Sequence, residues 1–325
     1  MTATTAAPGR VPPSRTVAAH RPRRHRADRV AIVLFLAPAL LLFVLLVLAP
    51  IALAATVSLV KWNGFVTSDP TFVGLDNFTR LLGDQVFVGD LRRGLTIIVL
   101  SLVLQLPMAL GLAMLLNQPL RGRSLYRLLF FAPYVLSEVT TAVLFRIVFS
   151  PEHGLATRTL AVVGLDDLGA TWLADPDTVL FWVFVVISWK YFGFHMILYL
   201  AGRQNIPKEL LEAATTDGAN AWQAFRHVTL PLLGPTIRIS VFLSVIGAIQ
   251  LFDMVWVLTG GGPVHASEVM AVTMYRFGFE RFEVGYASAM SIAMFLISLV
   301  FALLYQRFVM RRDIEGALTV MGGQR

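Results

Sequence analysis

Long runs of apolar residues, separated by short polar segments, dominate this chain of 325 residues. Because about 20 apolar residues are needed to cross roughly 30 Å of hydrocarbon as an α-helix, each run is a candidate membrane span. The runs predict six spans, which are Val30–Val60, Gly94–Leu116, Leu125–Phe149, Val179–Leu200, Thr236–Leu258 and Gly285–Met310. The pattern therefore predicts an all-α polytopic membrane protein with about six transmembrane helices.

The first and third runs depart from this simple pattern. The first is unusually long and contains Pro38 and Pro50, so we expect it to kink or to end early. The third is interrupted by Glu138 and Arg146, which are costly in lipid. A cleaved signal peptide is the alternative for the first run, because the tripeptide at 52–54 resembles a cleavage site. The run exceeds the roughly 7–15 residues of a signal-peptide core, so we interpret it as a span.

Composition agrees with a membrane protein. Hydrophobic residues make up 56% of the chain and charged residues only 14%, with a mean hydropathy of +0.70. Soluble domains contain about 25% charged residues, so this chain lacks the polar surface that a soluble protein of its length needs. The sequence contains no cysteine, which excludes disulfides and thiol catalysis.

The positive charges are placed in a way that indicates topology. The formal net charge is +7, but most of the 27 Lys and Arg residues lie in the N-terminal segment or flank the apolar runs. No nucleic-acid-binding motif accompanies them, so no nucleic acid partner is expected. Their excess on alternate polar segments predicts that both termini are cytoplasmic. We divide the chain into a basic, disordered cytoplasmic tail (1–29), a transmembrane domain (30–315) and a short C-terminal tail (316–325).

The most patterned polar segment is the loop at 202–234, between the fourth and fifth predicted spans. Its core, LLEAATTDGANAWQAFRHVTLPLL, predicts a short helix that ends near Gly218, where a left-handed backbone is tolerated. Asn220 is a suitable cap for a second short helix, and Pro231 is expected to stop that helix. The acidic and small residues of the loop favour docking against another protein. A helix lying in the headgroups is the alternative, but its acids would be repelled by anionic lipid.

The segment EAATTDGANAWQAFRHVTLP resembles the EAA loop of the permease subunits of bacterial binding-protein-dependent ABC importers. That motif is Glu-Ala-Ala, three residues, Gly, nine residues, an aliphatic residue, one residue and Leu-Pro, and each position matches here. Four further segments resemble the carbohydrate-uptake branch of this family. They are VGLDNFTRLL (73–82), YLAGRQNIPKEL (199–210), FDMVWVLTGGGP (252–263) and GYASAMS (285–291). The resemblance extends from about residue 30 to residue 315.

This resemblance implies both a fold and an assembly. It implies a type I ABC importer permease in the bacterial cytoplasmic membrane that translocates a sugar or oligosaccharide without catalytic activity of its own. The implied partners are a second permease subunit, two ATPase subunits that use ATP and Mg, and an extracytoplasmic solute-binding protein. The loop would couple ATP hydrolysis to transport, with Glu212 meeting a basic residue of the ATPase. The coupling residues implied in this way are Glu212, Ala213, Ala214, Asp217, Gly218, Leu230 and Pro231.

The sequence contains no motif for chemistry in the chain itself. A phosphate-binding P-loop requires a lysine that follows a glycine, and none of Lys61, Lys190 and Lys208 does so. The histidines are scattered, so we expect neither a metal site nor a resident cofactor.

Polar residues within the predicted spans are candidates for the substrate pathway, because ionisable groups are costly in lipid and usually have a function there. Aromatic side chains beside them offer faces on which a sugar ring stacks. The candidates are Glu138, Trp189, Lys190, Tyr191, Phe194, Gln250, Asp253 and Trp256. A structural role is the alternative, in which Lys190 and Glu138 pair across two spans and Asp253 caps a helix or gates the pathway. The second permease subunit is an alternative location for the substrate contacts.

Other functions are weighed against sugar import. Import of a glycerol-phosphate-type solute would favour a basic pocket, and Lys190 is the only lysine deep within a predicted span. A secondary transporter would show inverted repeats and coupling-ion sites. A membrane enzyme would show catalytic polar clusters within its spans. None of these features is seen in the sequence, so ABC import is the favoured reading.

Overall fold

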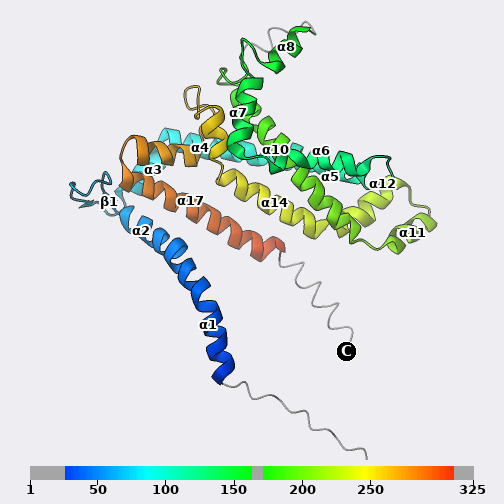
Figure 1. Cartoon of the computed structure of the whole chain (residues 1–325), viewed down its shortest axis with the longest axis horizontal. Helices are drawn as coiled ribbons and strands as arrows, with labels where there is room; N and C mark the ends of the chain where they lie inside the picture. Colours follow the sequence, from blue (N-terminus) through cyan, green and yellow to red (C-terminus); the bar gives the residue numbers. More distant parts are fainter. Residues whose placement is uncertain (1–25, 163–170, 311–325) are drawn as a thin grey trace, which may run out of the picture. The chain divides into compact units, whose positions relative to one another are not determined.

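The computed structural model describes residues 26–162 and 171–310, most of which are helical (Figure 1). The predicted C-terminal tail and most of the predicted N-terminal tail lie outside the described residues, whereas residues 26–29 already belong to the first helix. The all-α prediction is confirmed. The described residues also contain a small antiparallel hairpin, formed by β1 (Val60–Lys61) and β2 (Thr71–Phe72). The chain divides into two compact units, Met1–Ile51 and Ala52–Arg325.

The described part of the first unit is an apolar helix. It contains α1 (Arg26–Phe43), the π-helical turn η1 (Val44–Leu48) and the start of α2 (Ala49–Val57). Every side chain from residue 31 to residue 50 is apolar and exposed. The stretch Ala31–Val57 is long and apolar enough to cross a membrane. An apolar helix with no buried side chains is expected where lipid, rather than protein, surrounds it.

The second unit contains the hairpin and all the later helices, together with further π-helical turns that carry η labels. In chain order these are α3 (Asp76–Gly83), α4 (Gln85–Leu100), η2 (Ser101–Gln105), α5 (Leu106–Leu116), α6 (Arg123–Val135), α7 (Glu138–Val148), α8 (Leu155–Val162), α10 (Val179–Gln204), α11 (Lys208–Thr216), α12 (Ala221–Ala224), η3 (Phe225–Thr229), α13 (Leu230–Leu232), α14 (Gly234–Ile249), α15 (Asp253–Leu258), α16 (Met270–Tyr275), η4 (Arg276–Glu280), α17 (Val284–Tyr305) and η5 (Gln306–Met310).

The described residues contain four straight helical stretches and two bent helix pairs that are apolar enough to cross a membrane. The four stretches are Ala31–Val57, Gln85–Leu116, Val179–Gln204 and Val284–Met310. The bent pairs are Arg123–Val135 with Glu138–Val148, and Ala221–Leu232 with Gly234–Ile249. The prediction of about six spans holds if each bent pair is counted as one span.

The third predicted span, Leu125–Phe149, is wrong as a single helix. Helices α6 and α7 meet at an angle of 100°. Leu136 and Ser137, which separate them, have extended backbones. Pro133 in the last turn of α6 has no N–H to donate, which weakens the helix just before the break. Glu138 therefore begins α7 instead of lying in the middle of a long helix.

The fifth predicted span, Thr236–Leu258, is also divided. Helix α14 ends at Ile249, residues 250–252 are not helical, and α15 begins at Asp253. The carboxylate of Asp253 thus lies in the first turn of a helix, where the helix dipole favours a negative charge. A helix-end role for Asp253 is one of the alternatives that the sequence left open.

Three of the π-helical turns lie shortly before a proline within the same helical stretch. Pro50, Pro107 and Pro231 each follow the last residue of such a turn by two positions. A proline within a helix lacks an N–H, and its ring crowds the carbonyl four residues earlier, so a widened turn relieves the contact. The expectation that Pro231 stops the second loop helix is wrong. The helical stretch continues to Leu232 and then bends by 66° into α14.

Helix α10 is the central helix of the second unit and packs against α5, α6 and α14 (Figure 1). A Cβ atom at Gly193 would lie 1.8 Å from the carbonyl oxygen of Phe130, so only glycine permits this close approach of α10 to α6. Small residues on α5 lie in its contact with α10. The apolar cluster between α5 and α10 contains Ala109, Ala113, Leu116, Met196, Tyr199 and Leu200.

A buried charged cluster holds the segment between α15 and α16 against α4. The fully buried carboxylate of Asp90 accepts hydrogen bonds from Arg93 at 2.6 Å and from Thr273 at 2.5 Å. Glu268 is also buried, and its carboxylate accepts a hydrogen bond from Arg276 at 3.1 Å. Each carboxylate has a guanidinium partner, so neither charge is buried without compensation.

Candidate functional site

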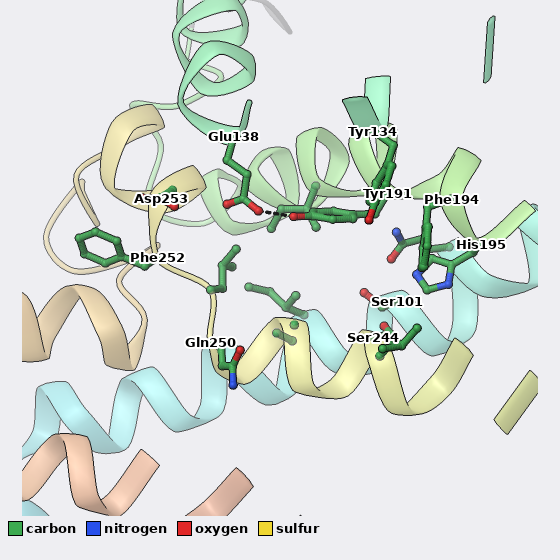
Figure 2. A pocket seen from close by; sticks show the side chains of 17 residues that line it. Ser101, Tyr134, Glu138, Tyr191, Phe194, His195, Ser244, Gln250, Phe252 and Asp253 are labelled. Carbon is green, nitrogen blue, oxygen red and sulfur yellow. Dashed lines mark hydrogen bonds between the residues drawn. The ribbon is translucent and has the colours of Figure 1, made fainter. Parts of the chain in front are cut away.

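Both helix breaks open onto one cavity of about 400 Å³, which Figure 2 shows from close by. Its walls come from α4, η2, α6, α7, α10, α14, the non-helical segment 250–252 and the first residue of α15. Small-molecule pockets typically enclose about 300–1,000 Å³. Non-helical backbone at membrane depth is tolerated where it lines a cavity, because its free polar groups find other partners there. The two breaks therefore mark this cavity as the candidate substrate site.

Aromatic side chains form one wall of the cavity. The rings of Tyr134 and Phe194 are stacked with their centroids 4.8 Å apart, and Tyr191 meets Tyr134 edge-on at 6.0 Å. All three side chains line the cavity (Figure 2). Exposed ring faces of this kind stack against the apolar face of a sugar ring.

Carboxylates from both helix breaks also line the cavity. Glu138, at the start of α7, accepts a hydrogen bond from the hydroxyl group of Tyr191 (Figure 2). Asp253, at the start of α15, lines the same cavity beside Gln250 and Phe252. The lining contains no Lys or Arg side chain among the residues that the structure describes. This arrangement suits a ligand that donates hydrogen bonds and carries no negative charge.

Lys190 does not line the cavity and does not pair with Glu138. Its ammonium group is buried and donates hydrogen bonds to the backbone carbonyls of Tyr134, at 3.4 Å, and Leu136. The last carbonyls of a helix have no partner within that helix, and a lysine satisfies them well because of its charge. Across the described ranges, no ion pair joins Lys190 to Glu138, so the proposed cross-span pair is not formed. The side chain instead secures the end of α6 at the break.

Two other sequence candidates lie away from the cavity lining. Trp189 is 39% exposed and packs edge-on against Phe145, with ring centroids 5.0 Å apart. Trp256 lines a separate pocket of about 590 Å³ that Arg146 and Thr259 also line. The structure thus brings together Glu138, Tyr191, Phe194, Gln250 and Asp253 from the predicted set.

The sequence candidates omitted several polar residues that line the cavity. Ser101 and Gln105 lie one helical turn apart in η2, and His195 lies one turn after Tyr191 in α10. The Nδ1 atom of His195 lies 2.6 Å from the hydroxyl oxygen of Ser240. The sequence did contain a signal for Ser101 and Gln105. Two polar residues four positions apart in an apolar span lie on the same helix face and therefore indicate a polar lining. Tyr134, Ser244 and Phe252 complete the omitted residues labelled in Figure 2.

The loop between α10 and α14 has the helix, turn and helix order that its sequence predicts. Helix α11 ends in a left-handed residue, Gly218, with φ of +83°. The N–H of Ala219 bonds to the carbonyl of Ala214 at 2.9 Å, and the N–H of Gly218 bonds to Thr215 at 3.1 Å. This pair of bonds is the Schellman motif, which satisfies the last carbonyls of a helix and reverses the chain sharply.

The second loop helix begins at a capping box. The side chain of Asn220 accepts the N–H of Gln223, and the side chain of Gln223 accepts the N–H of Asn220. Glu212, Ala213 and Asp217 are exposed on the turn before it. The loop therefore presents a compact turn of small residues with two exposed carboxylates, which we call the knuckle (residues 212–220). Such a surface is suited to a cleft on another protein.

The bent and broken helices around a cavity, together with an exposed helical knuckle, define a polytopic membrane transport subunit. Comparison with known proteins then identifies the family. Residues 105–314 match the family described as "Binding-protein-dependent transport system inner membrane component". The chain belongs to this family, which confirms the resemblance in its EAA loop.

Individual relatives match over most of their length. The chain is 37% identical over 277 residues to the probable ABC transporter permease protein YurN of Bacillus subtilis, covering 85% of this chain and 94% of that protein. It is 34% identical to the lactose transport system permease protein LacF of Rhizobium radiobacter, covering 86% and 93% of the two chains. A chain in the crystal structure of a bacterial ABC transporter involved in alginate import aligns with a TM-score of 0.76 and 25% identity, covering 88% of this chain and 96% of that one. The fold is that of an ABC importer permease.

The candidate site combines hydrogen-bonding side chains with aromatic rings. Within the described ranges, no group of three or more His, Asp or Glu side chains is placed to hold a metal ion. The matching family is one of membrane components of transport systems.

Proposed function

We propose that this chain is the permease subunit of an importer for a neutral sugar or oligosaccharide. The observation that carries the substrate class is the composition of the cavity. Carboxylate and amide groups stand beside an aromatic wall, which matches the hydroxyl groups and the apolar ring faces of a sugar. Relatives whose names specify lactose and diacetylchitobiose support this class.

A glycerol-phosphate-type solute is disfavoured by the same cavity. A phosphate group requires positively charged or N–H donors, and Arg or Lys usually supplies them. The cavity presents Glu138 and Asp253 instead, while the ammonium group of Lys190 is directed to backbone carbonyls. A dianionic solute would face two carboxylates with no compensating cation from the described lining.

The family assignment supports the proposed assembly. Its description as binding-protein-dependent supports a solute-binding protein as the partner that delivers the substrate. A second permease subunit would complete the pathway, and two ATPase subunits would hydrolyse ATP with Mg. The protein would lie in the bacterial cytoplasmic membrane. The loop at 202–234 and both termini would then be on the cytoplasmic side. This orientation rests on the excess of positive charge on that side.

Movement of the docked loop would reach the cavity through α10 and α14, the two helices on either side of the loop. The second loop helix leads through the bend at Leu233 into α14, which ends at the break beside Gln250. The loop's first helix follows directly from α10, which carries Tyr191 and Phe194. Closure of the two ATPases would therefore shift both α10 and α14, and would open the cavity alternately to the two sides.

The proposal is tested by replacing the carboxylate that Tyr191 orients. Glu138→Gln keeps the side-chain size but removes a charged acceptor. A hydrogen bond to a charged group contributes about 1.5–3 kcal/mol, so we expect the rate of sugar uptake to fall roughly tenfold or more. Uptake of radiolabelled lactose, maltose and diacetylchitobiose by cells that carry the complete transporter measures this effect.

Glu152→Gln provides the matched control, because the side chain of Glu152 is 85% exposed and lies outside the cavity. Its uptake should equal that of the unaltered protein. Equal uptake by the Glu138→Gln and Glu152→Gln variants, at equal amounts in the membrane, would remove the assignment of this cavity as the sugar site.

A further inference from the structure

A second pocket, of about 320 Å³, lies where α5 ends, α6 begins and α10 leads into α11. Four of the residues that line it are cationic, and none is acidic. The lining consists of Asn117, Arg123, Arg127, Arg203, Gln204, Ile206 and Lys208. None of the four cations has an ion-pair partner among the residues that the structure describes. The pocket is separate from the cavity that contains Glu138.

An unpaired cluster of this kind is unfavourable unless an anion occupies it. Four positive charges at one small pocket repel one another, and the repulsion is strongest where water is partly excluded. Arg127 donates one hydrogen bond from Nη2 to the carbonyl of Leu116 at 3.1 Å. Its Nε atom is buried and has no hydrogen-bond partner. A buried N–H donor without an acceptor is costly, which points to a missing acceptor in this pocket.

We propose that this pocket binds the phosphate group of an anionic phospholipid. The inference rests on the proposed function in one respect, which is the cytoplasmic position of the 202–234 loop. Guanidinium groups bind phosphate oxygens in a bidentate manner, and three arginines line the pocket. Basic pockets between transmembrane helices on the cytoplasmic side are suited to anionic headgroups.

The position of the pocket favours a lipid over a soluble phosphate. It lies at the ends of two candidate spans, Gln85–Leu116 and Val179–Gln204, which is the depth of the headgroups. Leu115 on α5 and Leu125 on α6 lie two positions along the chain from lining residues of the pocket and are 57% and 58% exposed. These apolar side chains offer a surface for the acyl chains of a lipid whose headgroup is in the pocket.

Occupancy would connect the lipid to the coupling loop. Arg123 and Arg127 belong to α6, Arg203 to the end of α10, and Lys208 is the first residue of α11. A bound phosphate group would therefore hold α11 against α6, a short distance along the chain from Glu212. Lipid composition would then affect the position of the loop that we propose docks on the ATPase.

The test compares the purified complete transporter with two variants by native mass spectrometry during lipid titration. Arg127→Gln combined with Arg203→Gln removes two cations from the pocket. Arg121→Gln is the matched control, because Arg121 is exposed in the same polar turn but does not line the pocket. The probes are dioleoyl phosphatidylglycerol, dioleoyl phosphatidylcholine and inorganic phosphate.

We expect phosphatidylglycerol to bind more tightly than phosphatidylcholine, and the double variant to lose about tenfold or more in affinity for it. The Arg121→Gln variant should bind like the unaltered protein. Displacement of phosphatidylglycerol by millimolar inorganic phosphate would assign the pocket to free phosphate and would overturn the assignment to a lipid.

An unaltered protein that binds the two lipids equally would overturn the proposal, even if the double variant fails to fold. Equal affinity of the double and control variants for phosphatidylglycerol would also overturn it. The readout is lipid binding and not sugar uptake. Failure to detect specific lipid binding therefore leaves the proposed transport function intact. Failure to detect sugar uptake likewise leaves the lipid-binding result intact.

Discussion

At the residue scale, Lys190 has a role that its position in the sequence conceals. A lysine in the middle of an apolar run suggests a substrate contact or an ion pair. The structure places its ammonium group on the backbone carbonyls of Tyr134 and Leu136, at the break between α6 and α7. The same break presents Tyr134 and Glu138 to the cavity. Lys190 is thus a positioning residue for the cavity wall.

Replacement of Lys190 by Met should destabilise the protein as well as slow uptake. Met retains the apolar stem but leaves two partly buried carbonyl groups without this donor, which costs about 1–3 kcal/mol. Thermal unfolding of the purified protein in detergent, together with the rate of sugar uptake, measures both effects. Lys61→Met, at an exposed position of β1, is the control and should change neither. An unchanged unfolding temperature in the Lys190→Met variant would contradict the positioning role.

At the scale of elements, the cavity depends on close packing between α10 and α6. Gly193 lets the two helices approach so closely that the backbone of α6 lies where a Cβ atom would be. Two of the aromatic residues in the cavity wall, Tyr191 and Phe194, flank this contact on α10, and Tyr134 lies on α6. The spacing of α10 and α6 therefore determines the stacking of Tyr134 on Phe194.

Gly193→Ala should separate these helices and disorganise the cavity wall. The added methyl group would lie 1.8 Å from the carbonyl oxygen of Phe130, so the backbone must move. Overpacking of this kind costs about 1–3 kcal/mol, and we expect a lower unfolding temperature and slower uptake. Gly111→Ala on α5 is the matched control, because no atom lies within 4 Å of its added Cβ. Equal stability of the two variants would show that α6 and α10 adjust at no cost.

At the scale of the whole molecule, α10 and α14 connect the loop at 202–234 to the cavity. Helix α10 and the stretch Ala221–Leu232 with α14 both run from the loop to the cavity lining. The turn at Gly218 is held by backbone hydrogen bonds of its own, and its residues are largely exposed. The knuckle is thus formed by local backbone contacts, and under the proposed function α10 and α14 would transmit its movement.

Two substitutions in the knuckle should uncouple transport from ATP hydrolysis. Gly218→Val forces a β-branched residue into φ of +83°, which costs about 1–3 kcal/mol although no atom lies within 4 Å of the new Cβ. Glu212→Lys reverses the charge of an exposed side chain. We expect sugar uptake to fall at least tenfold in each variant, with normal insertion into the membrane.

Uptake, membrane content and co-purification of the ATPase subunits measure the uncoupling. Glu152→Lys is the charge-reversal control, since Glu152 lies in an exposed segment after α7. Normal uptake and normal ATPase recovery in both knuckle variants would refute the coupling role of this loop.

Several features of the protein were determined by local sequence alone. Apolar runs of sufficient length dictate membrane helices, because lipid provides no hydrogen bonds to the backbone. The loop geometry followed from Gly218 and Asn220, since a left-handed residue and a capping side chain act on neighbouring backbone groups. The family followed from twenty adjacent residues with fixed spacing.

Other features were decided only by tertiary structure. The break at Leu136–Ser137 has Pro133 as its local signal, but the backbone carbonyls beside it are satisfied by Lys190 of the distant helix α10. The break at 250–252 lies within a run that was predicted to be one span. The same packing separates Trp189 and Trp256 from the cavity lining, and adds Ser101, Gln105 and His195 to it. Periodicity along one helix shows which residues share a face. Which face meets a cavity depends on the neighbouring helices, and therefore on contacts between residues far apart in the chain.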